Sequence, residues 1–286
     1  MADSEAASID AALAGWDPPP TTVGDPMDGG PAAALAAALD VAPPSTWLPP
    51  LWHWLHFLDW PPTGALGRDG HRAGGEFLPP IPERTRMFVG GRLDIAAGLR
   101  IGMAARRRSA VVNRSVKTGR SGTMLLLTVR HEIEQGGKVA VVDEQDLMYR
   151  SGAPRGRPGP VGAPAVPVVC DAAWQEPFSA GPVVLFRFSA LTANSHRIHY
   201  DEPYATGIEG YPGLVVHGPL LAVALAGLVA RHAPDATMAS MSYRFARPVH
   251  AGERTLLAGR PGPAGAALAV LGGDGSPSAV ADVVMT

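Results

Sequence analysis

The sequence predicts an α+β fold of two similar halves, each an antiparallel sheet curled around a helix. In the second half, a strongly apolar helix is followed by a meander of strand-like segments over residues 219–285. The same outline is found, less clearly, over residues 20–150. A stretch rich in proline and glycine lies between them, at residues 151–168. With 286 residues, the chain is long enough for two domains of ordinary size.

The first half begins after an N-terminal tail, residues 1–19, which we expect to be flexible apart from a short helical piece. Residues 31–40 are a predicted helix, because Pro31 stands in the first turn and alanine and leucine fill the rest. An aromatic- and proline-rich stretch follows at residues 47–62. Alternating apolar residues between glycine-rich turns then predict strands at residues 84–93, 109–118, 122–134 and 138–148.

We expect residues 151–168 to form a linker and residues 169–286 to form the second half. In that half, residues 183–188 are a predicted strand, residues 189–197 a polar turn or short helix, and residues 201–216 a loop. An apolar helix with proline in its first turn and four strands complete the chain, at residues 219–231, 242–249, 253–260, 266–271 and 279–285.

Composition narrows the function classes. The apolar share of 46% excludes a disordered chain. The single cysteine, Cys170, excludes an intramolecular disulfide and a cysteine-rich zinc site. The longest apolar run, residues 220–230, is too short for a membrane span, which needs about 20 residues. The acidic N-terminus has no apolar signal core. We therefore expect a cytoplasmic protein without a membrane partner.

The charge distribution points to a small anionic ligand. The net charge of −2 argues against a general nucleic-acid binder. Residues 1–83 carry 2 basic and 11 acidic residues, whereas residues 84–120 carry 10 basic and 1 acidic residue. A local cationic segment suits one phosphate-bearing ligand better than a long polyanion. The alternative is that these arginines cover solvated strand faces, with residues 106–108 in a loop.

The residues that can perform chemistry gather before and at the start of the apolar helix. Residues 190–205, ALTANSHRIHYDEPYA, bring Asn194 and His199 into one polar turn, and residues 210–220, GYPGLVVHGPL, lead into the helix at Gly218. The N–H groups at a helix start can hold an oxyanion, and a glycine lets a carbonyl approach closely. A neighbouring histidine can move protons, so the pattern favours enolate chemistry.

Two other kinds of site fit this region poorly. The spacing of His196 and His199 does not suit a pair of metal ligands on a helix, and no cysteine is near, so we expect no metal. The chain also has no G-x-S-x-G signature of a serine nucleophile and no glycine-rich nucleotide loop.

These two segments resemble the motif of the MaoC-like hydratase 2 family of the hot-dog superfamily, which has the form S/T-G-D-x-N-P-L/I-H-x-D followed by V-H-G-M. Residues 242–253, SYRFARPVHAGE, resemble the next strand of the family. In the first half, LPPLWHWLHFL, LGRDGH, GEFLPPIP, MFVGGRL, VKTGRSG and EQDLMYR resemble the non-catalytic partner domain. Together they resemble the mesaconyl-C4-CoA (3-methylfumaryl-CoA) hydratase branch, related to mitochondrial-type 3-hydroxyacyl-thioester dehydratases.

The resemblance implies a double hot-dog fold, with two antiparallel sheets each wrapped around a central helix and packed as a pseudo-dimer. His199 matches the catalytic histidine and Gly218 the oxyanion-hole amide. Asn194 stands where the motif has its catalytic aspartate; an amide cannot be a general base, but it can position the attacking water. The alternatives are that His199 is a structural histidine, that Asn194 caps the turn and that Gly218 caps the helix.

The same resemblance suggests substrate contacts. Arg197 could bind the carboxylate of a mesaconyl-C4 thioester in a bidentate fork, the alternative being a salt bridge with Asp201 or Glu202. Four further basic residues could meet the phosphates of coenzyme A: Arg92, Lys117, Arg120 and Arg244.

The implied function is that of a hydro-lyase which adds water reversibly to an enoyl-CoA thioester, turning mesaconyl-C4-CoA into citramalyl-CoA. Coenzyme A is part of the substrate, and no cofactor is expected because the thioester itself acidifies Cα. The alternatives are a broader 3-hydroxyacyl-thioester dehydratase, a hot-dog thioesterase and a non-catalytic acyl-CoA-binding protein. The first half would complete the acyl tunnel, and a homodimer stays open.

Overall fold

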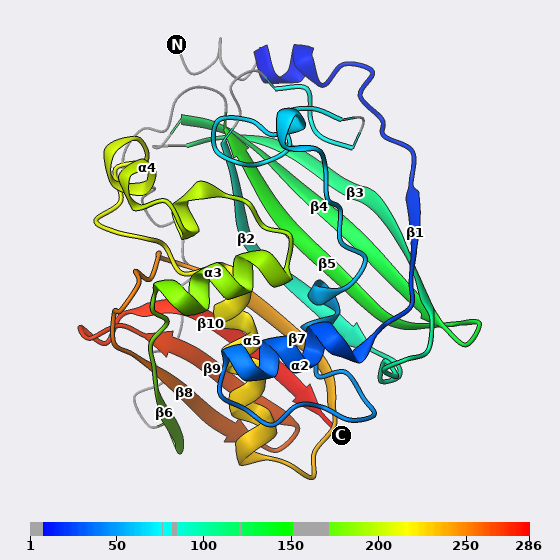
Figure 1. The fold of residues 1–286 in the computed structure, drawn as a ribbon, viewed down its shortest axis with the longest axis vertical. Helices are drawn as coiled ribbons and strands as arrows, with labels where there is room; N and C mark the ends of the chain where they lie inside the picture. The colour runs from blue at the N-terminus through cyan, green and yellow to red at the C-terminus, as the bar shows by residue number, and fades with distance from the viewer. Residues whose placement is uncertain (1–7, 76, 82–84, 120–121, 151–171) are drawn as a thin grey trace.

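The computed structural model describes residues 8–75, 77–81, 85–119, 122–150 and 172–286. In this part of the chain, ten strands form one antiparallel sheet with the order β1-β3-β4-β5-β2-β7-β10-β9-β8-β6. Figure 1 shows the sheet curving behind a layer of helices. The expected linker, residues 151–168, lies outside the described residues.

The first half supplies five neighbouring strands: β1 (Thr21–Asp25), β2 (Thr85–Ile95), β3 (Ala105–Gly119), β4 (Gly122–Gln135) and β5 (Lys138–Arg150). The four predicted strands are confirmed and are slightly longer than expected. The arginine run at residues 106–108 belongs to β3, which corrects its assignment to a loop. The short edge strand β1 was not predicted, because its exposed residues show no apolar alternation.

The second half supplies the other five strands: β6 (Trp174–Phe178), β7 (Met238–Phe245), β8 (Thr255–Gly262), β9 (Gly265–Leu271) and β10 (Pro277–Met285). All four predicted strands are present, although β7 begins and ends four residues earlier than expected. Strands β8, β9 and β10 form the predicted meander, whereas β7 pairs with β10 instead of β8, which corrects the expected order. The short edge strand β6 was not predicted.

The two halves share one sheet because β2 pairs with β7 in antiparallel register, from Gly90 opposite Arg244 to Asp94 opposite Ser240. This corrects the expectation of two separate sheets. An edge strand exposes unpaired N–H and C=O groups, and pairing these two edges satisfies both. Side chains of the second half therefore lie beside those of the first along the middle of the molecule.

Helix α5 (Gly218–His232) is the central helix of the second half, as expected. Its apolar side chains are almost all buried, and the strands of the second half curve around it (Figure 1). The first half departs from the expectation. Its helix α2 (Gly29–Ala38) packs beside α3 (Pro182–Leu191), where Arg187 donates to the Ala37 carbonyl over 3.2 Å.

The sheet of the first half is covered by short segments instead of a long helix. The 3-10 turn η1 (Trp52–Leu55) packs into the main core. Ile9, Leu13 and Ile81 are buried in a second apolar cluster with Leu125 and other residues of β4 and β5. The described part of the expected flexible tail is therefore packed against the sheet rather than loose.

Residues 183–188 lie in α3, so the prediction of a strand there is wrong. The sequence VVLFRF is rich in β-branched and aromatic residues, which is typical of strands. Helical spacing nevertheless buries Leu185 and Phe188 while Val183 and Phe186 stay exposed. Short helical segments in the described part of the chain include residues 8–12, η2 (Thr63–Ala65), η3 (Arg197–His199) and α4 (Glu202–Gly207).

Candidate active site

The polar turn before α4 is held against the start of α5 by backbone hydrogen bonds. The Val215 N–H donates to the Ile198 carbonyl over 2.9 Å, and the Val216 N–H donates to the Val249 carbonyl over 2.8 Å. These bonds place η3 next to the last residues before α5. The predicted juxtaposition of the histidine turn and the helix start is therefore present in the structure.

His199 is buried, and its ring orientation is fixed by the backbone. Its Nδ1 lies 2.7 Å from the Val215 carbonyl oxygen. A carbonyl can only accept, so Nδ1 carries the hydrogen and Nε2 keeps a lone pair. Burial lowers the pKa of His199 from 6.5 to about 4, against the opposing effect of the Val215 hydrogen bond. The imidazole is consequently neutral near pH 7, the form that a general base requires.

The side chain of His217 packs against the face of the His199 ring. Its imidazole stacks on that of His199 with centroids 3.7 Å apart and planes 19° apart. His217 is fully buried, and its Nε2 lies 2.9 Å from the Ser189 hydroxyl of α3. Burial holds the pKa of His217 well below its ordinary value. These contacts fit a structural residue that anchors the helix start and supports His199.

Gly218 is the first residue of α5 and directly follows His217, the N-cap. The N–H groups of a first helical turn have no acceptor within the helix and carry partial positive charge. A Cβ atom at position 218 would lie 2.8 Å from the ring of Phe245 on β7. Glycine is therefore needed for Phe245 to pack against the helix start, next to the stacked histidines.

Asn194 caps the turn that carries His199. Its side-chain oxygen accepts from the His196 N–H over 3.1 Å, and its own N–H donates to the Ser189 carbonyl over 2.9 Å. This local bond is the turn-capping contact that Asn side chains commonly make. Whether the amide also positions water stays a prediction.

Arg197 is engaged by neighbouring groups. Its Nε and one terminal nitrogen donate to Asp201 over 2.9 and 2.6 Å, and the other terminal nitrogen donates to the Arg68 carbonyl over 3.1 Å. The guanidinium also lies 4.1 Å from the ring centroid of Tyr204. The salt bridge with Asp201, the alternative to a substrate contact, is thus present, and binding of a substrate carboxylate stays a prediction.

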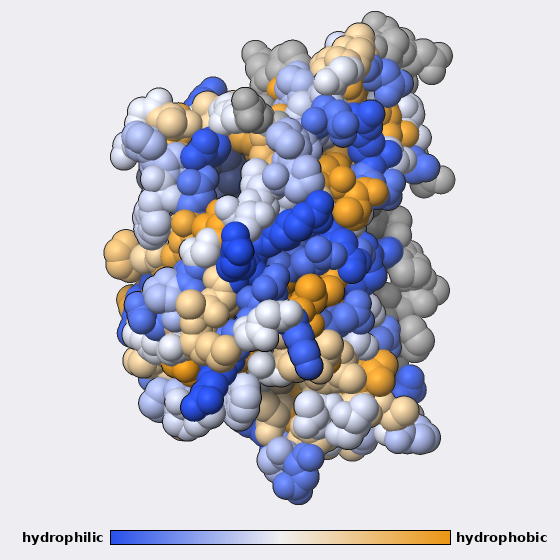
Figure 2. All heavy atoms as spheres, turned by 90° about the vertical axis from the view of Figure 1, so that its right-hand side faces the viewer, coloured by the Kyte–Doolittle hydropathy of each residue, from blue (hydrophilic) through white to orange (hydrophobic). Residues whose placement is uncertain are grey.

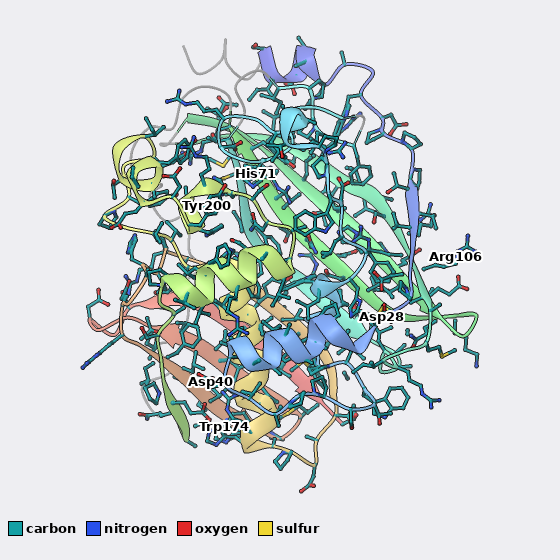
Figure 3. All side chains as sticks on the ribbon, viewed as in Figure 1. Asp28, Asp40, His71, Arg106, Trp174 and Tyr200 are labelled. Atoms are coloured by element: carbon teal, nitrogen blue, oxygen red, sulfur yellow. The ribbon has the colours of Figure 1, made fainter. Side chains whose placement is uncertain are left out.

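The first half reaches into the site through the loop at residues 67–71. The Arg197 N–H donates to the Asp69 carbonyl over 2.9 Å, and the Ser195 hydroxyl donates to the Gly70 carbonyl over 2.5 Å. Figure 3 shows His71 beside the turn that carries Tyr200, while Arg106 lies at the opposite edge of the molecule. No local feature of the sequence indicates a chemical role for this loop, because nothing local shows that it meets residues more than 120 positions away.

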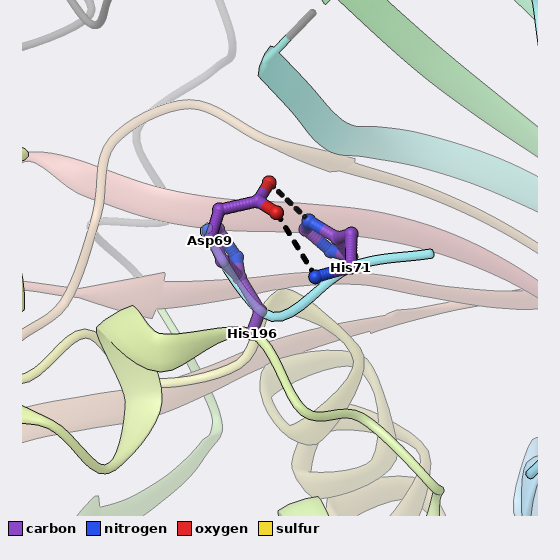
Figure 4. A group of neighbouring side chains, drawn as sticks. All are labelled: Asp69, His71 and His196. Carbon is purple, nitrogen blue, oxygen red and sulfur yellow. Dashed lines mark hydrogen bonds and ion pairs between the residues drawn. The ribbon is translucent and has the colours of Figure 1, made fainter. Parts of the chain in front are cut away.

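Three side chains of this junction lie close enough to be considered as metal ligands. One ligand atom each from Asp69, His71 and His196 lies within 4.8 Å of the other two. Figure 4 shows that the Asp69 carboxylate is turned toward His71, accepting from its Nδ1 over 2.8 Å and from its backbone N–H over 3.0 Å. The carboxylate therefore already has a partner that explains its position.

The basic residues predicted to meet coenzyme A do not form one cluster, although Arg92 and Arg244 are neighbours on adjacent strands. Arg92 pairs with Glu144 and Asp146 on the outer face of the sheet. The β2–β7 register puts Arg244 on that same face, opposite to the face on which the buried Leu93 and Tyr243 contact the core.

Lys117 lies elsewhere on the sheet. It is exposed near the end of β3, and the strand registers place it about seven residues, or roughly 23 Å, along the sheet from Arg92. Arg120 lies outside the described residues. A shared phosphate contact for this set stays untested.

Arginines 106–108 of the cationic segment lie on a strand, so the strand placement of the alternative interpretation applies to them but its loop does not. Arg106 and Arg108 are exposed on β3, and the Arg107 guanidinium lies 5.4 Å from the ring centroid of the buried Phe57. Figure 2 faces the edge that carries β1 and β3 and shows hydrophilic side chains across its middle. Among the described residues, no helix is both long enough and apolar enough to cross a membrane.

Comparison with known proteins shows the family of the chain. The family described as hydroxyacyl-thioester dehydratase type 2 matches residues 51–251. This range includes the start of α5 and the loop at residues 67–71, which we call the junction loop. A mesaconyl-C(4)-CoA hydratase of Chloroflexus aurantiacus is 47% identical over 225 residues, covering 76% of this chain and 79% of the relative.

Solved structures support the fold. A MaoC-like dehydratase from Phytophthora capsici superposes with a TM-score of 0.69 at 14% identity, covering 97% of this chain and 98% of the other. A Mycobacterium tuberculosis protein described as a double hot-dog fold superposes with a TM-score of 0.56 at 15% identity, covering 94% and 96%. At such identities the likeness concerns the fold, and it confirms the double hot-dog architecture.

Proposed function

Because the chain belongs to the hydroxyacyl-thioester dehydratase type 2 family, we propose that it catalyses the reversible hydration of mesaconyl-C4-CoA to citramalyl-CoA. The family makes the chain a hydro-lyase acting on an acyl thioester. The choice of substrate rests on the 47% identity to the Chloroflexus aurantiacus hydratase over most of both chains.

One observation carries the catalytic part of the proposal. The His199 imidazole is held by Val215 and stacked on His217, the residue that immediately precedes Gly218. A base and a positively polarised helix start are therefore neighbours. A conjugated thioester bound between them would meet a proton acceptor and an anion-stabilising group at the same time.

In the hydration direction, Nε2 of His199 takes a proton from water, and the water oxygen adds to Cβ. The charge that develops on the thioester oxygen is stabilised by the Gly218 N–H at the start of α5. The enolate collapses when a proton reaches Cα. Asn194 would keep the turn in shape and hold the water by its amide, because an amide does not act as a base.

The substrate carboxylate is assigned to Arg197 in this proposal, since that guanidinium lies two residues from His199 in the same 3-10 turn. Its salt bridge with Asp201 would then share or exchange one donor when substrate binds. Coenzyme A contacts are assigned to Arg92, Lys117, Arg120 and Arg244 only as single residues, since the described ones do not form one cluster.

The proposal is tested with a panel of enoyl-CoA esters, with and without a distal carboxylate. We expect the absorbance of the conjugated thioester to fall without release of thiol, most rapidly for mesaconyl-C4-CoA. Equal rates across the panel would favour a broader dehydratase. Release of thiol would identify a thioesterase, and binding without either change would identify an acyl-CoA-binding protein.

A second test uses His199→Gln. We expect a loss of at least about 100-fold in turnover with little change in substrate affinity, because general-base catalysis contributes about 10²–10⁴ in rate. Full activity of this variant would disprove the assignment of the base.

A further inference from the structure

The junction loop of the first half carries a carboxylate–imidazole pair that the reaction described above does not use. Asp69 Oδ2 lies 2.8 Å from Nδ1 of His71, and Asp69 Oδ1 accepts from the His71 N–H over 3.0 Å. Both side chains are about one-fifth exposed. The pair is therefore neither a solvated surface contact nor sealed in the core.

The pair is fixed directly on the catalytic turn. Three hydrogen bonds from Ser195 and Arg197 end on the carbonyls of Arg68, Asp69 and Gly70. A Cβ atom at Gly70 would lie 1.9 Å from the Ser195 carbonyl oxygen, and Gly70 has a φ of +88°. Only glycine allows this approach, so the loop can dock on the turn without displacing it.

Four imidazole rings follow one another across the junction. His71 lies against His196 with centroids 4.1 Å apart, His196 meets His199 edge-on at 5.5 Å, and His199 stacks on His217 at 3.7 Å. The row runs from the part-exposed loop of the first half to the buried start of α5. His71 and His199 are thus both neighbours of the His196 ring.

His199 and His71 have opposite electrostatic environments. Burial keeps His199 neutral, and burial likewise holds the pKa of His196 well below its ordinary value. The Asp69 carboxylate favours the doubly protonated ring of His71, and the hydrogen bonds and charge of His71 lower the pKa of Asp69 although burial opposes this. A neutral buried imidazole and an imidazole paired with a carboxylate suit the base and the acid of one reaction.

Other charged and titratable groups face this row. Arg86 of β2 acts on His196, and Arg68 and Glu209 act with Asp69 on Tyr204. Arg197 is occupied by Asp201 and the Arg68 carbonyl. Among these neighbours, Asp69 is the carboxylate in direct contact with a histidine of the row.

We propose that His71, charged by Asp69, is the acid partner of His199 and supplies the proton that reaches Cα. This inference rests on the hydratase function proposed above. Water gives its hydroxyl group to Cβ and its proton to Nε2 of His199. The His71 imidazolium gives a proton to Cα and becomes neutral. Proton transfer from His199 back to His71, through solvent or through His196, restores both groups, so that one water is added per cycle.

The assignment also accounts for Asn194. The hydratase 2 motif has a carboxylate there, whereas this chain has an amide that caps the turn. The first half would supply a carboxylate to the same catalytic turn as Asp69, and it would then be a catalytic contributor as well as a structural partner.

The first test is independent of turnover. Nitrogen-15 NMR of the imidazole rings, assigned with His71→Gln, reports how many protons each ring carries at neutral pH. We expect two on His71 and one on His199, and we expect His71 to lose its second proton in Asp69→Asn. A singly protonated His71 in the parent protein would overturn the proposal, even if the protein hydrates mesaconyl-C4-CoA.

The second test uses the pH profile of hydration. Asp69→Asn removes the charge but keeps an oxygen that can accept from the His71 N–H. We therefore expect the alkaline limb of the kcat profile to move to lower pH. We also expect kcat at neutral pH to fall about tenfold or more, while KM changes by no more than about twofold. Asp69→Glu should restore part of the rate. Glu176→Gln, which changes a similar pair with His232 near the far end of α5, is the matched control and should leave the profile unchanged.

The outcomes separate the hypotheses. A parent protein that hydrates no enoyl-CoA would contradict the proposed function, whereas the NMR result would still decide the state of His71. An active Asp69→Asn variant with an unchanged alkaline limb would contradict the acid role. Loss of activity on chelation, with recovery on adding Zn²⁺, would show that Asp69, His71 and His196 hold a metal, and would also overturn it.

Discussion

At the scale of single residues, the site depends on how His199 is held. Its hydrogen bond to the Val215 carbonyl leaves the lone pair on Nε2, and its stacking on His217 fixes the plane of the ring. A rotation of the ring would cost both contacts. The ring is therefore held in one orientation, which is what the proposed role of His199 as a base requires.

Replacing Asn194 separates capping from water positioning. Asn194→Ala removes the acceptor for the His196 N–H, so we expect a loss of about 1 kcal/mol in the free energy of unfolding together with lower turnover. Asn194→Asp keeps an acceptor at the same place and should preserve stability. Denaturant unfolding and hydration rates of both variants check this. Equal stability of Asn194→Ala and the parent protein would exclude the cap.

Arg197→Ala tests the carboxylate contact. If the guanidinium binds substrate, the rate with mesaconyl-C4-CoA falls about tenfold more than the rate with crotonyl-CoA, which has no distal carboxylate. If it serves only the salt bridge with Asp201 and the bond to Arg68, both rates fall alike. Steady-state kinetics on the two substrates distinguish these results, and equal losses would remove the carboxylate clamp.

The sequence predicted the local parts of the site and missed its long-range part. His199, Asn194 and Gly218 stand in two short segments whose pattern is informative by itself. Asp69 and His71 stand in a glycine-rich loop, and their meeting with His196 depends on how the two halves pack. No local periodicity or spacing records such a meeting, so sequence reasoning could not have assigned them a chemical role.

At the scale of elements, the start of α5 is shaped by the close approach of β7. The Phe245 ring occupies the space where a side chain at position 218 would lie. The helix can begin at this point only with glycine, whatever part its N–H takes in catalysis. Packing against Phe245 is therefore enough to require glycine at this position.

Gly218→Ala should therefore destabilise the fold by about 1–3 kcal/mol, because the added methyl group meets an aromatic ring at 2.8 Å. Gly218→Ala combined with Phe245→Leu, which makes room, should recover part of that loss. Thermal unfolding of the two variants measures the effect. A stable single variant would mean that Phe245 moves aside at little cost.

The errors in the predicted elements have a common physical cause. Most strands were found because long alternating runs determine them locally, as in β4 and β10. The sequence of residues 183–188 resembles a strand because five of the six residues are β-branched or large and apolar, whereas tertiary packing favours helix α3. Strands β1 and β6 could not be predicted, because five residues at a sheet edge are too few to show an alternation of apolar and polar residues.

At the scale of the whole molecule, buried histidines make stability depend on pH. Burial lowers the pKa of both His199 and His131 to about 4, from 6.5. The folded state therefore favours the neutral rings. This contribution is complete above pH 6.5 and is lost as the pH falls from 6.5 toward 4.

Denaturant unfolding at pH 7 and pH 5 should show lower stability at pH 5. The loss by pH 4 is up to about 3 kcal/mol for His199 and less for the half-buried His131. His199→Gln should flatten this dependence, because a glutamine does not titrate. Equal stability of the parent protein at both pH values would contradict the burial argument.

The global arrangement could be predicted only in outline. Two halves of similar architecture followed from the repeated order of a helix and strands. The pairing of β2 with β7 could not be predicted in this way. Every open sheet has two edge strands, and the sequence of neither strand indicates which strand it pairs with. The absence of a long central helix from the first half was equally hidden, since its covering segments are short and irregular.

The β2–β7 seam has a practical consequence. If the two halves were produced as separate polypeptides, each would expose one unpaired edge strand, and the two edges could pair with each other. Each fragment would also lack part of the imidazole row, because the contact between His71 and His196 joins the two halves. Co-production of the fragments would restore turnover only through reassembly, which makes this scaffold suitable for a split-enzyme reporter of protein proximity.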